Sequence, residues 1–455
     1  MKLAKSLSLG LAMIVGLIAL SGPAMAAVSD ETQFIFNSFL FLVCGFLVMF
    51  MAAGFAMLEA GLVRTKNVAA ICLKNIALYS VAGLMFWLMG YNLMYGVAET
   101  GTGFAGEWFS IWAADDSAIE AGDFSGAYAA GSDWFFQMVF CATTASIVSG
   151  TVAERIKVWP FMIFIAVLTG VIYPIIGSWE WGTGWLDRGP LASVVDADGN
   201  PIGFSDFAGS TLVHSTGGWA ALVGAIVLGA RKGKFAADGT VHPIPGSNLP
   251  LATLGTFILW LGWFGFNGGS QLALGSAADA AAVSNIFINT NIAAAAGVVA
   301  AIALTQIMYK KIDLTMALNG ALAGLVSITA EPLTPSIGEA ALIGAVGGIL
   351  VVIFVPLLDK LKIDDVVGAV SVHLVAGIWG TMAVPITNAD TSFAVQAVGV
   401  IAVGVFVSAV SFVLWSLLKA TVGLRVSEEE EYEGLDKSEL GLEAYPEFGR
   451  GSQKM

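Results

Sequence analysis

Long runs of residues without charge constrain this chain more than any other feature. These runs recur along the sequence and are each roughly 20 to 30 residues long. An α-helix of this length crosses the hydrocarbon core of a bilayer. With 57% hydrophobic and 12% charged residues and a mean hydropathy of +0.82, a water-soluble globule is excluded. The pattern also lacks the alternating segments typical of a transmembrane β-barrel. We therefore predict an all-α polytopic membrane protein.

The first 26 residues have the pattern of a secretory signal peptide. Two lysines precede a short apolar core, residues 7–20, and the small-residue sequence Pro-Ala-Met-Ala follows at 23–26. We expect cleavage after Ala26. The alternative is an uncleaved extra span, which the short apolar core and the well-formed cleavage site disfavour.

Eleven segments are predicted to span the membrane in the mature chain. Their bounds are roughly 33–61, 68–97, 134–153, 158–178, 207–230, 249–270, 284–308, 314–332, 338–357, 366–386 and 393–418. The remaining residues, 419–455, carry a run of glutamates followed by scattered apolar residues. We interpret them as a tail outside the membrane that docks on the inner face or on a partner.

Basic residues alternate between the connecting loops. Eleven lysines and arginines lie in every second loop, whereas the intervening loops hold only Arg188. By the positive-inside rule, the basic loops and the tail are cytoplasmic and the mature N-terminus is outside. A long outer loop, 98–132, holds six acidic residues and neither Lys nor Arg. We interpret it as a solvated loop, with attraction of cations as the alternative.

Two of the three histidines lie within predicted spans, at positions that repeat. Asp206 stands eight residues before His214, as Asp365 stands before His373, and glycine follows each histidine four residues later. An ionisable residue within a membrane span is costly to bury, so it marks a candidate functional site. Because these histidines fall in the fifth and tenth spans, we predict two related halves of five spans. Five is odd, so the halves run in opposite senses, as an inverted repeat with its site near the midplane.

Two histidines in a dry interior are compatible with haem, a metal ion, a proton relay or a pore for a small polar solute. Haem would require more paired histidines, and His242 lies in a cytoplasmic loop. A metal would require a third or fourth ligand, and the three cysteines lie in apolar runs as expected for buried hydrophobes. Neutral imidazole offers one donor and one acceptor, and burial favours that form. This chemistry suits a solute such as ammonia better than a bare ion.

Aromatic residues gather at the outer ends of three spans. They lie in 136–140, 179–185 and 262–270. An interfacial aromatic belt is the simpler interpretation. The sharper one is a vestibule in which ring faces and a hydroxyl hold a small cation.

Several segments together resemble the ammonium transporter family, which includes methylammonium permeases and Rhesus proteins. They are 153–156, 206–214, 262–270, 319–324 and 372–373. The resemblance extends from the first span to the tail and implies a homotrimer with one pore per subunit. It also implies that the tail contacts a cytoplasmic PII signal protein. Two residues depart from the family pattern, namely Ser178, where many relatives have histidine, and Leu374, where glycine is common.

The resemblance implies a role for each of seven residues. These are Trp181, Phe140, Ser270 and Asp206 for an outer ammonium site, with Asp206 as its supporting carboxylate, Phe140 and Phe266 for a stacked gate, and His214 and His373 for the pore. No cofactor, metal or nucleic-acid partner is expected.

The resulting prediction is a bacterial inner-membrane ammonium transporter. Residues 1–26 form the signal peptide, 27–418 the transporting domain and 419–455 a regulatory tail. NH4+ is expected to bind at the outer site and lose its proton before NH3 passes the histidines. An ammonium sensor that signals through the tail is the main alternative, although no output domain follows residue 418. An intramembrane enzyme lacks a nucleophile motif beside either histidine, and a Rhesus-type channel for carbon dioxide is a further possibility.

Overall fold

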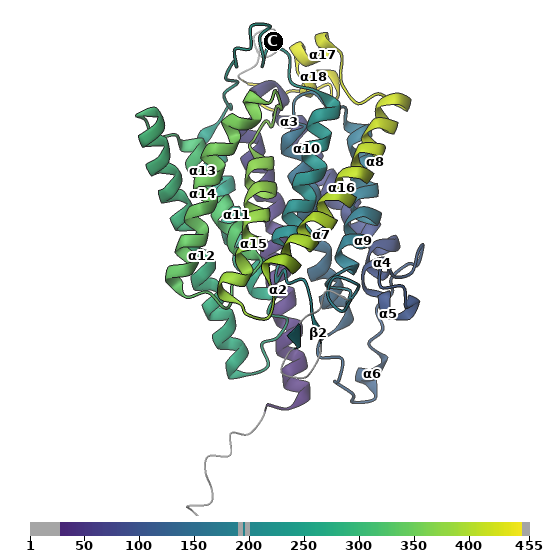
Figure 1. Ribbon diagram of the computed structural model, residues 1–455. Coiled ribbons are helices and arrows are strands. Elements are labelled where there is room, and N and C mark those ends of the chain that lie inside the picture. The colour runs from purple at the N-terminus through teal and green to yellow at the C-terminus, as the bar shows by residue number, and fades with distance from the viewer. Residues whose placement is uncertain (1–27, 190–193, 196–200, 448–455) are drawn as a thin grey trace, which may run out of the picture.

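The computed structural model describes residues 28–189, 194–195 and 201–447, so the signal-peptide prediction lies outside the described residues. Nearly all regular structure is helical (Figure 1). The elements are α2 Asp30–Leu62, η1 Thr65–Asn67, α3 Val68–Met85, η2 Phe86–Gly90, α4 Tyr91–Tyr95, α5 Val97–Thr100, α6 Ser117–Glu120, α7 Ala130–Thr151, α8 Val158–Val167, η3 Leu168–Ile172, α9 Tyr173–Ser178, β1 Val194–Val195, β2 Pro201–Ile202, η4 Ser210–Ser215, α10 Thr216–Leu228, α11 Leu249–Gly269, α12 Ala277–Tyr309, α13 Leu314–Thr329, α14 Ile337–Lys360, η5 Val370–Val375, α15 Ala376–Thr387, α16 Phe393–Thr421, α17 Glu428–Glu433 and α18 Leu435–Ser438. The two strands pair antiparallel as the only sheet in the part of the chain that is described.

The helices confirm an all-α membrane protein. Within the described ranges, nine helical segments are long and apolar enough to cross a bilayer. The two other expected spans are also helical, α7 with 22 residues and the shorter α13 with 16. All eleven expected segments are therefore helices, and that all eleven cross the membrane stays a prediction.

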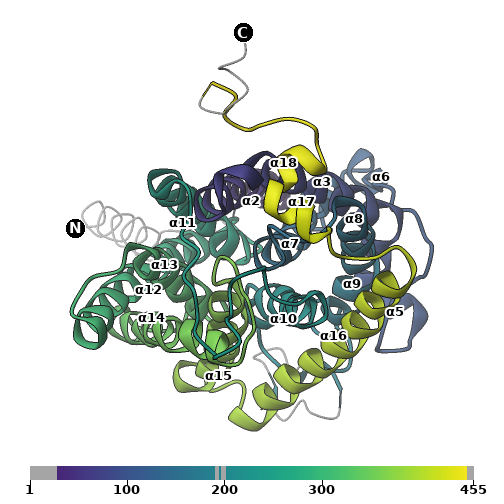
Figure 2. The same ribbon diagram turned by 90° about the horizontal axis from the view of Figure 1, so that it is seen from above.

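The bundle has two sides that meet along α2 and α11 (Figure 2). On one side α12, α13 and α14 pack on one another, and on the other α7 packs against α2, α3 and α10, while α16 crosses the rim diagonally. Glycines allow the close approach of α2 and α11. A Cβ at Gly255 would lie 2.3 Å from the backbone nitrogen of Leu58, and one at Gly61 would lie 2.5 Å from that of Ala252. Small residues at helix contacts let backbones approach in this way in membrane proteins.

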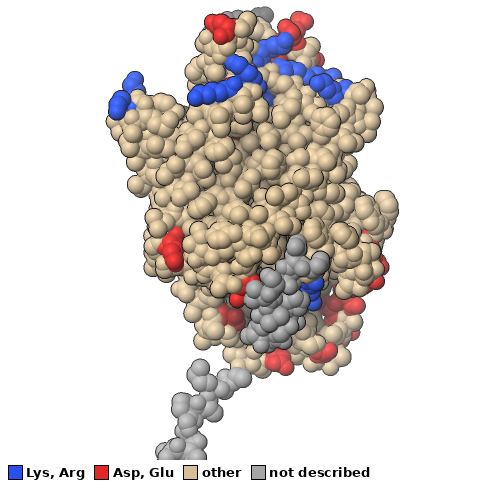
Figure 3. Space-filling view, viewed as in Figure 1, with Lys and Arg blue, Asp and Glu red and all other residues tan. Residues whose placement is uncertain are grey.

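The two ends of the bundle differ in charge (Figure 3). Lys and Arg gather at the end that carries α17 and α18, which we call the basic face. The opposite end, which carries α5 and α6, shows mainly Asp and Glu, and we call it the acidic face. The uncharged belt between them is the surface expected to contact lipid.

The tail folds back onto the basic face. The Asp436 carboxylate of α18 accepts hydrogen bonds from the backbone N–H groups of Ala69 and Ala70, at 3.0 and 2.8 Å, in the first turn of α3. The backbone N–H of Leu435 donates to the side chain of Asn67 at 2.9 Å. A carboxylate is favoured at a helix N-terminus, where backbone N–H groups are unsatisfied. The tail is thus docked on the start of α3 through α18.

The two histidine-bearing helices begin at opposite faces with matching local structure. The Asp206 carboxylate accepts hydrogen bonds from four backbone N–H groups, those of residues 209–212, at 2.8 to 3.1 Å. The Asp365 carboxylate accepts two, from Ala369 and Val370, at 3.1 and 2.8 Å. Each aspartate therefore begins a π-helical turn, η4 or η5, that carries a histidine. The helix of the fifth expected span, which was placed from roughly residue 207, begins at Ser210, after Gly209 with its φ of 105°.

The repeated glycines interlock the two halves. A Cβ at Gly218 on α10 would lie 2.8 Å from the backbone nitrogen of Leu374 in η5, and one at Gly377 on α15 would lie 2.5 Å from the carbonyl oxygen of Ser210 in η4. Each glycine thus lets its helix contact the π turn of the other half. Leu374 itself packs over Gly218, which gives this departure from the family pattern a place in the core.

Candidate functional site

The two histidines are brought into direct contact in the middle of the bundle. The Nδ1 atoms of His214 and His373 lie 3.1 Å apart, and their rings are 5.2 Å apart and nearly parallel. Their exposed fractions are 0% and 3%. With Nδ1 facing Nδ1, one neutral ring donates and the other accepts. The His214 Nε2 atom is buried and has no hydrogen-bond partner among the described residues.

A continuous row of aromatic rings leads to the histidines from the acidic face. Successive centroid distances are 6.2 Å from Trp181 to Phe140, 3.9 Å from Phe140 to Phe266, 5.2 Å from Phe266 to His214 and 6.1 Å from His373 to Phe55. The Phe140 and Phe266 rings are stacked at 21°. The structure therefore brings the expected gate and pore residues together as a series of neighbouring rings.

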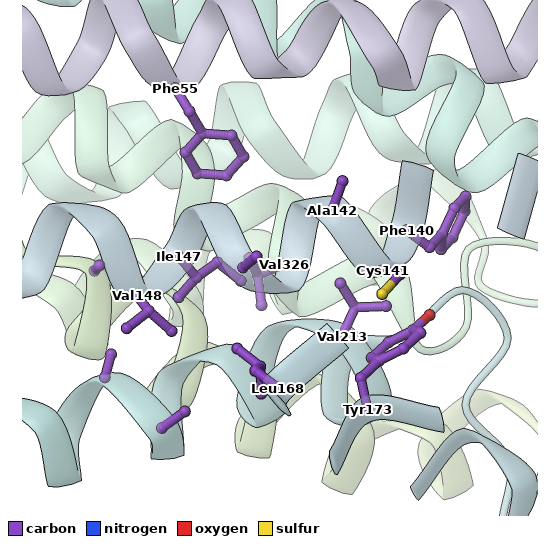
Figure 4. Packing of buried hydrophobic residues seen from close by; sticks show 14 of the residues in the cluster. Phe55, Phe140, Cys141, Ala142, Ile147, Val148, Leu168, Tyr173, Val213 and Val326 are labelled. Carbon is purple, nitrogen blue, oxygen red and sulfur yellow. The ribbon is translucent and has the colours of Figure 1, made fainter. Parts of the chain in front are cut away.

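Buried apolar side chains from several helices pack in the core that contains Phe55 and Phe140 (Figure 4). Phe55 extends from α2, and Phe140, Ala142, Ile147 and Val148 come from α7. All five belong to the main buried hydrophobic cluster. Phe140 thus belongs both to the ring row and to this apolar core.

A cavity of about 290 Å³ opens above the stacked rings at the acidic face. Trp181, Phe140 and Ser270 all line it, as expected for an outer site. The indole Nε1 of Trp181 donates to the carbonyl oxygen of Asp206 at 3.1 Å, which fixes the indole ring. The Ser270 hydroxyl donates to the carbonyl of Phe266 at 2.9 Å and keeps its lone pairs free.

Asp206 supports this region without facing the cavity. Its carboxylate is fully buried, and both oxygens accept backbone N–H groups at the start of η4. It is not among the residues that line the cavity. Asp206 therefore positions Trp181 and the histidine turn through its backbone and its helix-capping role.

Two cavities lie on the other side of the histidine pair. A small one, about 10 Å³, is lined by His373, Phe55 and Glu59 among others, and has room for about one water molecule. A larger one, about 400 Å³, opens at the basic face. Asn319 and Val367 line both, so the two spaces adjoin.

Sequence reasoning missed a buried acid and a buried base beside this inner space. Glu59 on α2 and Lys74 on α3 are each 1% exposed. Ser149 joins them, because its hydroxyl donates to the Glu59 carboxylate at 2.8 Å while its carbonyl accepts from Lys74 Nζ at 3.1 Å. Their presence inside predicted spans was the available signal.

Other residues of the outer cavity were also not singled out as site residues. Phe136, Gln137, Asp133 and three tyrosines line it together with the expected residues. Phe136 lies 4.8 Å from Phe140 by ring centroids and stacks on Phe41. The departure Ser178 is buried near this end, where its hydroxyl is hydrogen-bonded to the carbonyls of Ile175 and Phe104 at 2.6 and 2.8 Å.

The histidine pair has no metal-ligating neighbours of the usual kind. Over the described ranges, no group of three or more His, Cys, Asp or Glu side chains is placed to hold an ion. The three cysteines are free, with Cys44 and Cys141 buried and Cys72 half-buried.

The described residues form a polytopic membrane protein with span-length helices and two ends of opposite charge. At its centre, stacked aromatic rings adjoin a pair of buried histidines. A sequence profile for the Ammonium Transporter Family matches residues 39–445. The chain belongs to the ammonium transporter family.

Relatives and solved structures agree with this assignment. The chain is 43% identical to the ammonium transporter Amt2 of Archaeoglobus fulgidus, over 90% of this chain and 87% of that protein. It is 34% identical to the ammonium transporter of Bacillus subtilis, over 88% and 96% of the two chains. Among solved structures, it matches a protein described as a sensor Amt protein at 36% identity and a TM-score of 0.80, with 90% and 98% of the two chains covered. Mep2 of Candida albicans matches at 25% identity and a TM-score of 0.75, with 89% of each chain covered.

Proposed function

We propose that this chain transports ammonium inward across a bacterial inner membrane, from the acidic face to the basic face. Family membership supports the substrate. The excess of Lys and Arg at the basic face supports a cytoplasmic position for that face and for the tail. In this orientation the mature N-terminus is outside.

In the proposed mechanism, NH4+ first binds in the outer cavity between Trp181, Phe140 and Ser270. Ring faces attract the cation, and the serine oxygen accepts a hydrogen bond from one N–H group of the ammonium ion. Moving further means entering an apolar passage, where a bare charge is costly. The ion therefore loses a proton, and NH3 passes between Phe140 and Phe266.

The observation that carries this proposal is the contact between His214 and His373 at the end of the ring row. The buried His214 Nε2 atom, which no described residue satisfies, offers a hydrogen bond to a passing solute. NH3 both donates and accepts, so it can exchange hydrogen bonds along the pair. The proton either stays outside, which makes transport neutral, or follows along the imidazoles, which makes it electrogenic.

The current evoked by an ammonium pulse in proteoliposomes tests this mechanism. We expect wild type to give a saturable inward current or, if transport is neutral, an internal alkalinisation reported by a pH dye. His214→Ala removes a pore imidazole and should reduce the signal at least tenfold. Phe140→Ala should alter both half-saturation and maximal rate. Unchanged transport in His214→Ala would contradict the pore assignment.

An ammonium sensor is the second candidate. It is favoured by the similarity to the solved sensor Amt protein and by the tail docked on α3. A sensor would bind ammonium without current or alkalinisation, and the exposure of the tail to protease would change on binding. In either case we propose residues 27–418 as the membrane unit and 419–455 as a regulatory tail able to meet a PII protein.

We also propose a homotrimer. The outward faces of α2 and α11 carry large exposed apolar residues such as Phe39, Phe46 and Phe257, which suit contact with lipid or with further copies of the chain. Mass measurement of the complex in detergent tests this number.

A further inference from the structure

The outer cavity contains a carboxylate to which neither sequence motif nor family resemblance gave a role. Asp133 lies in the first turn of α7 and is 7% exposed. It lines the cavity together with Phe136, Gln137 and Phe140. These positions are spaced three, four and seven residues along the helix, so they share one face. Asp133 is seven residues from Phe140, which is about 10 Å along a helix axis.

Asp133 has hydrogen-bond donors but no cationic partner. The Tyr91 hydroxyl donates to Oδ2 and the Gln137 amide to Oδ1, the latter at 3.4 Å. No Lys, Arg or His nitrogen in the described chain lies within ion-pairing distance of it, and the one basic residue at this face, Arg188, pairs with Asp187. The positive end of the α7 dipole helps a carboxylate to remain here.

The space in front of this carboxylate has further features that suit a cation. Tyr91, Tyr95 and Tyr128 all line the cavity. The Tyr95 hydroxyl is buried and lacks a hydrogen-bond partner among the described residues. The Phe136 ring and the tyrosine rings add negative π faces. A buried carboxylate, an unsatisfied hydroxyl and aromatic faces thus converge on one space.

We propose that Asp133, with Tyr91, Tyr95 and Gln137, forms an entry subsite that holds a monovalent, hydrogen-bond-donating cation before it reaches Trp181. This inference rests on the proposed function, because the cation meant is ammonium or methylammonium. A divalent ion requires more oxygen ligands than one carboxylate supplies. Ammonium, with four N–H donors and one charge, matches the carboxylate, the phenols and the rings.

The subsite predicts a specific change in apparent affinity. Asp133→Asn keeps the shape and removes the charge, and we expect the half-saturating ammonium concentration for transport to rise at least tenfold, with the maximal rate within twofold of wild type. Asp133→Glu keeps the charge and should stay within threefold of wild type. The matched control is Asp123→Asn, which removes an exposed charge from the same face and should change nothing. All assays are run at constant ionic strength, since salt screens exposed charges.

A binding measurement separates this inference from the transport proposal. The rise in unfolding temperature with ammonium chloride, compared with sodium chloride, reports binding without flux. Wild type that binds but does not transport would refute the transport proposal, and the variants would still test the subsite. An unchanged affinity in Asp133→Asn would overturn the subsite, because the charge would then have no effect. An equal loss of affinity in Asp123→Asn would overturn it by showing a diffuse electrostatic field. A tenfold loss in Asp133→Glu would overturn it by showing an effect of packing.

Discussion

Two buried carboxylates at the basic face and two at the acidic face are compensated in different ways. At the basic face, Glu154 contacts Arg64 at 2.5 Å and Arg231 at 3.2 Å, and Asp364 contacts Arg231 at 2.8 Å. At the acidic face, and among the described residues, the Asp206 carboxylate has only backbone N–H partners and the Asp133 carboxylate has only a phenol and an amide. Carboxylates held by arginine are already neutralised and fix the loops, whereas an uncompensated carboxylate beside a cavity is available to a cation from solution.

Replacing Arg231, which pairs with both Glu154 and Asp364 at the basic face, should have the largest effect on stability. Arg231→Ala would leave Glu154 and Asp364 buried without their shared partner, which costs about 3–5 kcal/mol for a buried pair. We expect a clearly lower unfolding temperature in detergent. Adding Glu154→Gln and Asp364→Asn to Arg231→Ala should recover part of the loss, because the uncompensated charges are then gone. An unfolding temperature equal to that of wild type in Arg231→Ala would contradict the view that arginine compensates the buried carboxylates at the basic face.

Acidification should remove the stabilisation that two buried carboxylates give to the basic face. Burial raises the pKa of Glu154, but Arg231 and Arg64 outweigh burial and the net pKa is lowered. Burial likewise raises the pKa of Asp364, but its hydrogen bonds to Arg231 and the charge of Arg155 lower it well below the usual range. Groups with a lowered pKa stabilise the fold above their unfolded values of about 4. This stabilisation is lost as the pH falls further below that value.

The pH prediction is measured as unfolding temperature against pH. Wild type should lose stability progressively below about pH 4. The Glu154→Gln, Asp364→Asn double variant should be less stable at pH 7 and should show a flatter acid limb. Parallel curves for the two proteins would show that other groups control the acid transition.

An exposed pair on the same face should give the smallest effect. Lys232 contacts Glu428 at the start of α17, and both side chains are mostly exposed. Because solvent and salt screen such pairs, Glu428→Gln should leave the unfolding temperature unchanged within error. A decrease as large as that of Arg231→Ala would mean that charge number, rather than burial, distinguishes the two ends.

Much of this site was accessible from the sequence because its signals are local. His214 and His373 were identified by their place in apolar runs and by the aspartates eight residues earlier. The stacked Phe140 and Phe266 were assigned by resemblance, and the structure places them in line with the histidines. Asp133 was overlooked even though its spacing from Phe136 and Phe140 places it on their face of α7.

The remaining features depend on contacts between distant segments. Glu59 and Ser149 are 90 residues apart in the chain and share a hydrogen bond. The cavity around Asp133 is also lined by Tyr91, Tyr95 and Tyr128, which come from separate parts of the chain. Hydropathy and periodicity describe which face of one helix is apolar, but not which side chain of another helix will meet it.

The sequence by itself determined the membrane fold, the basic and acidic faces and the paired histidines, because bilayer thickness, charge bias and a polar residue in an apolar run are properties of single segments. Only the tertiary structure decided that Asp206 caps its own helix and that Gly218 and Gly377 bring the two π turns together. It also decided that Asp133 lines the outer cavity without a counter-charge from any described residue. The physical reason is that desolvation and charge compensation are set by all the helices that surround a group.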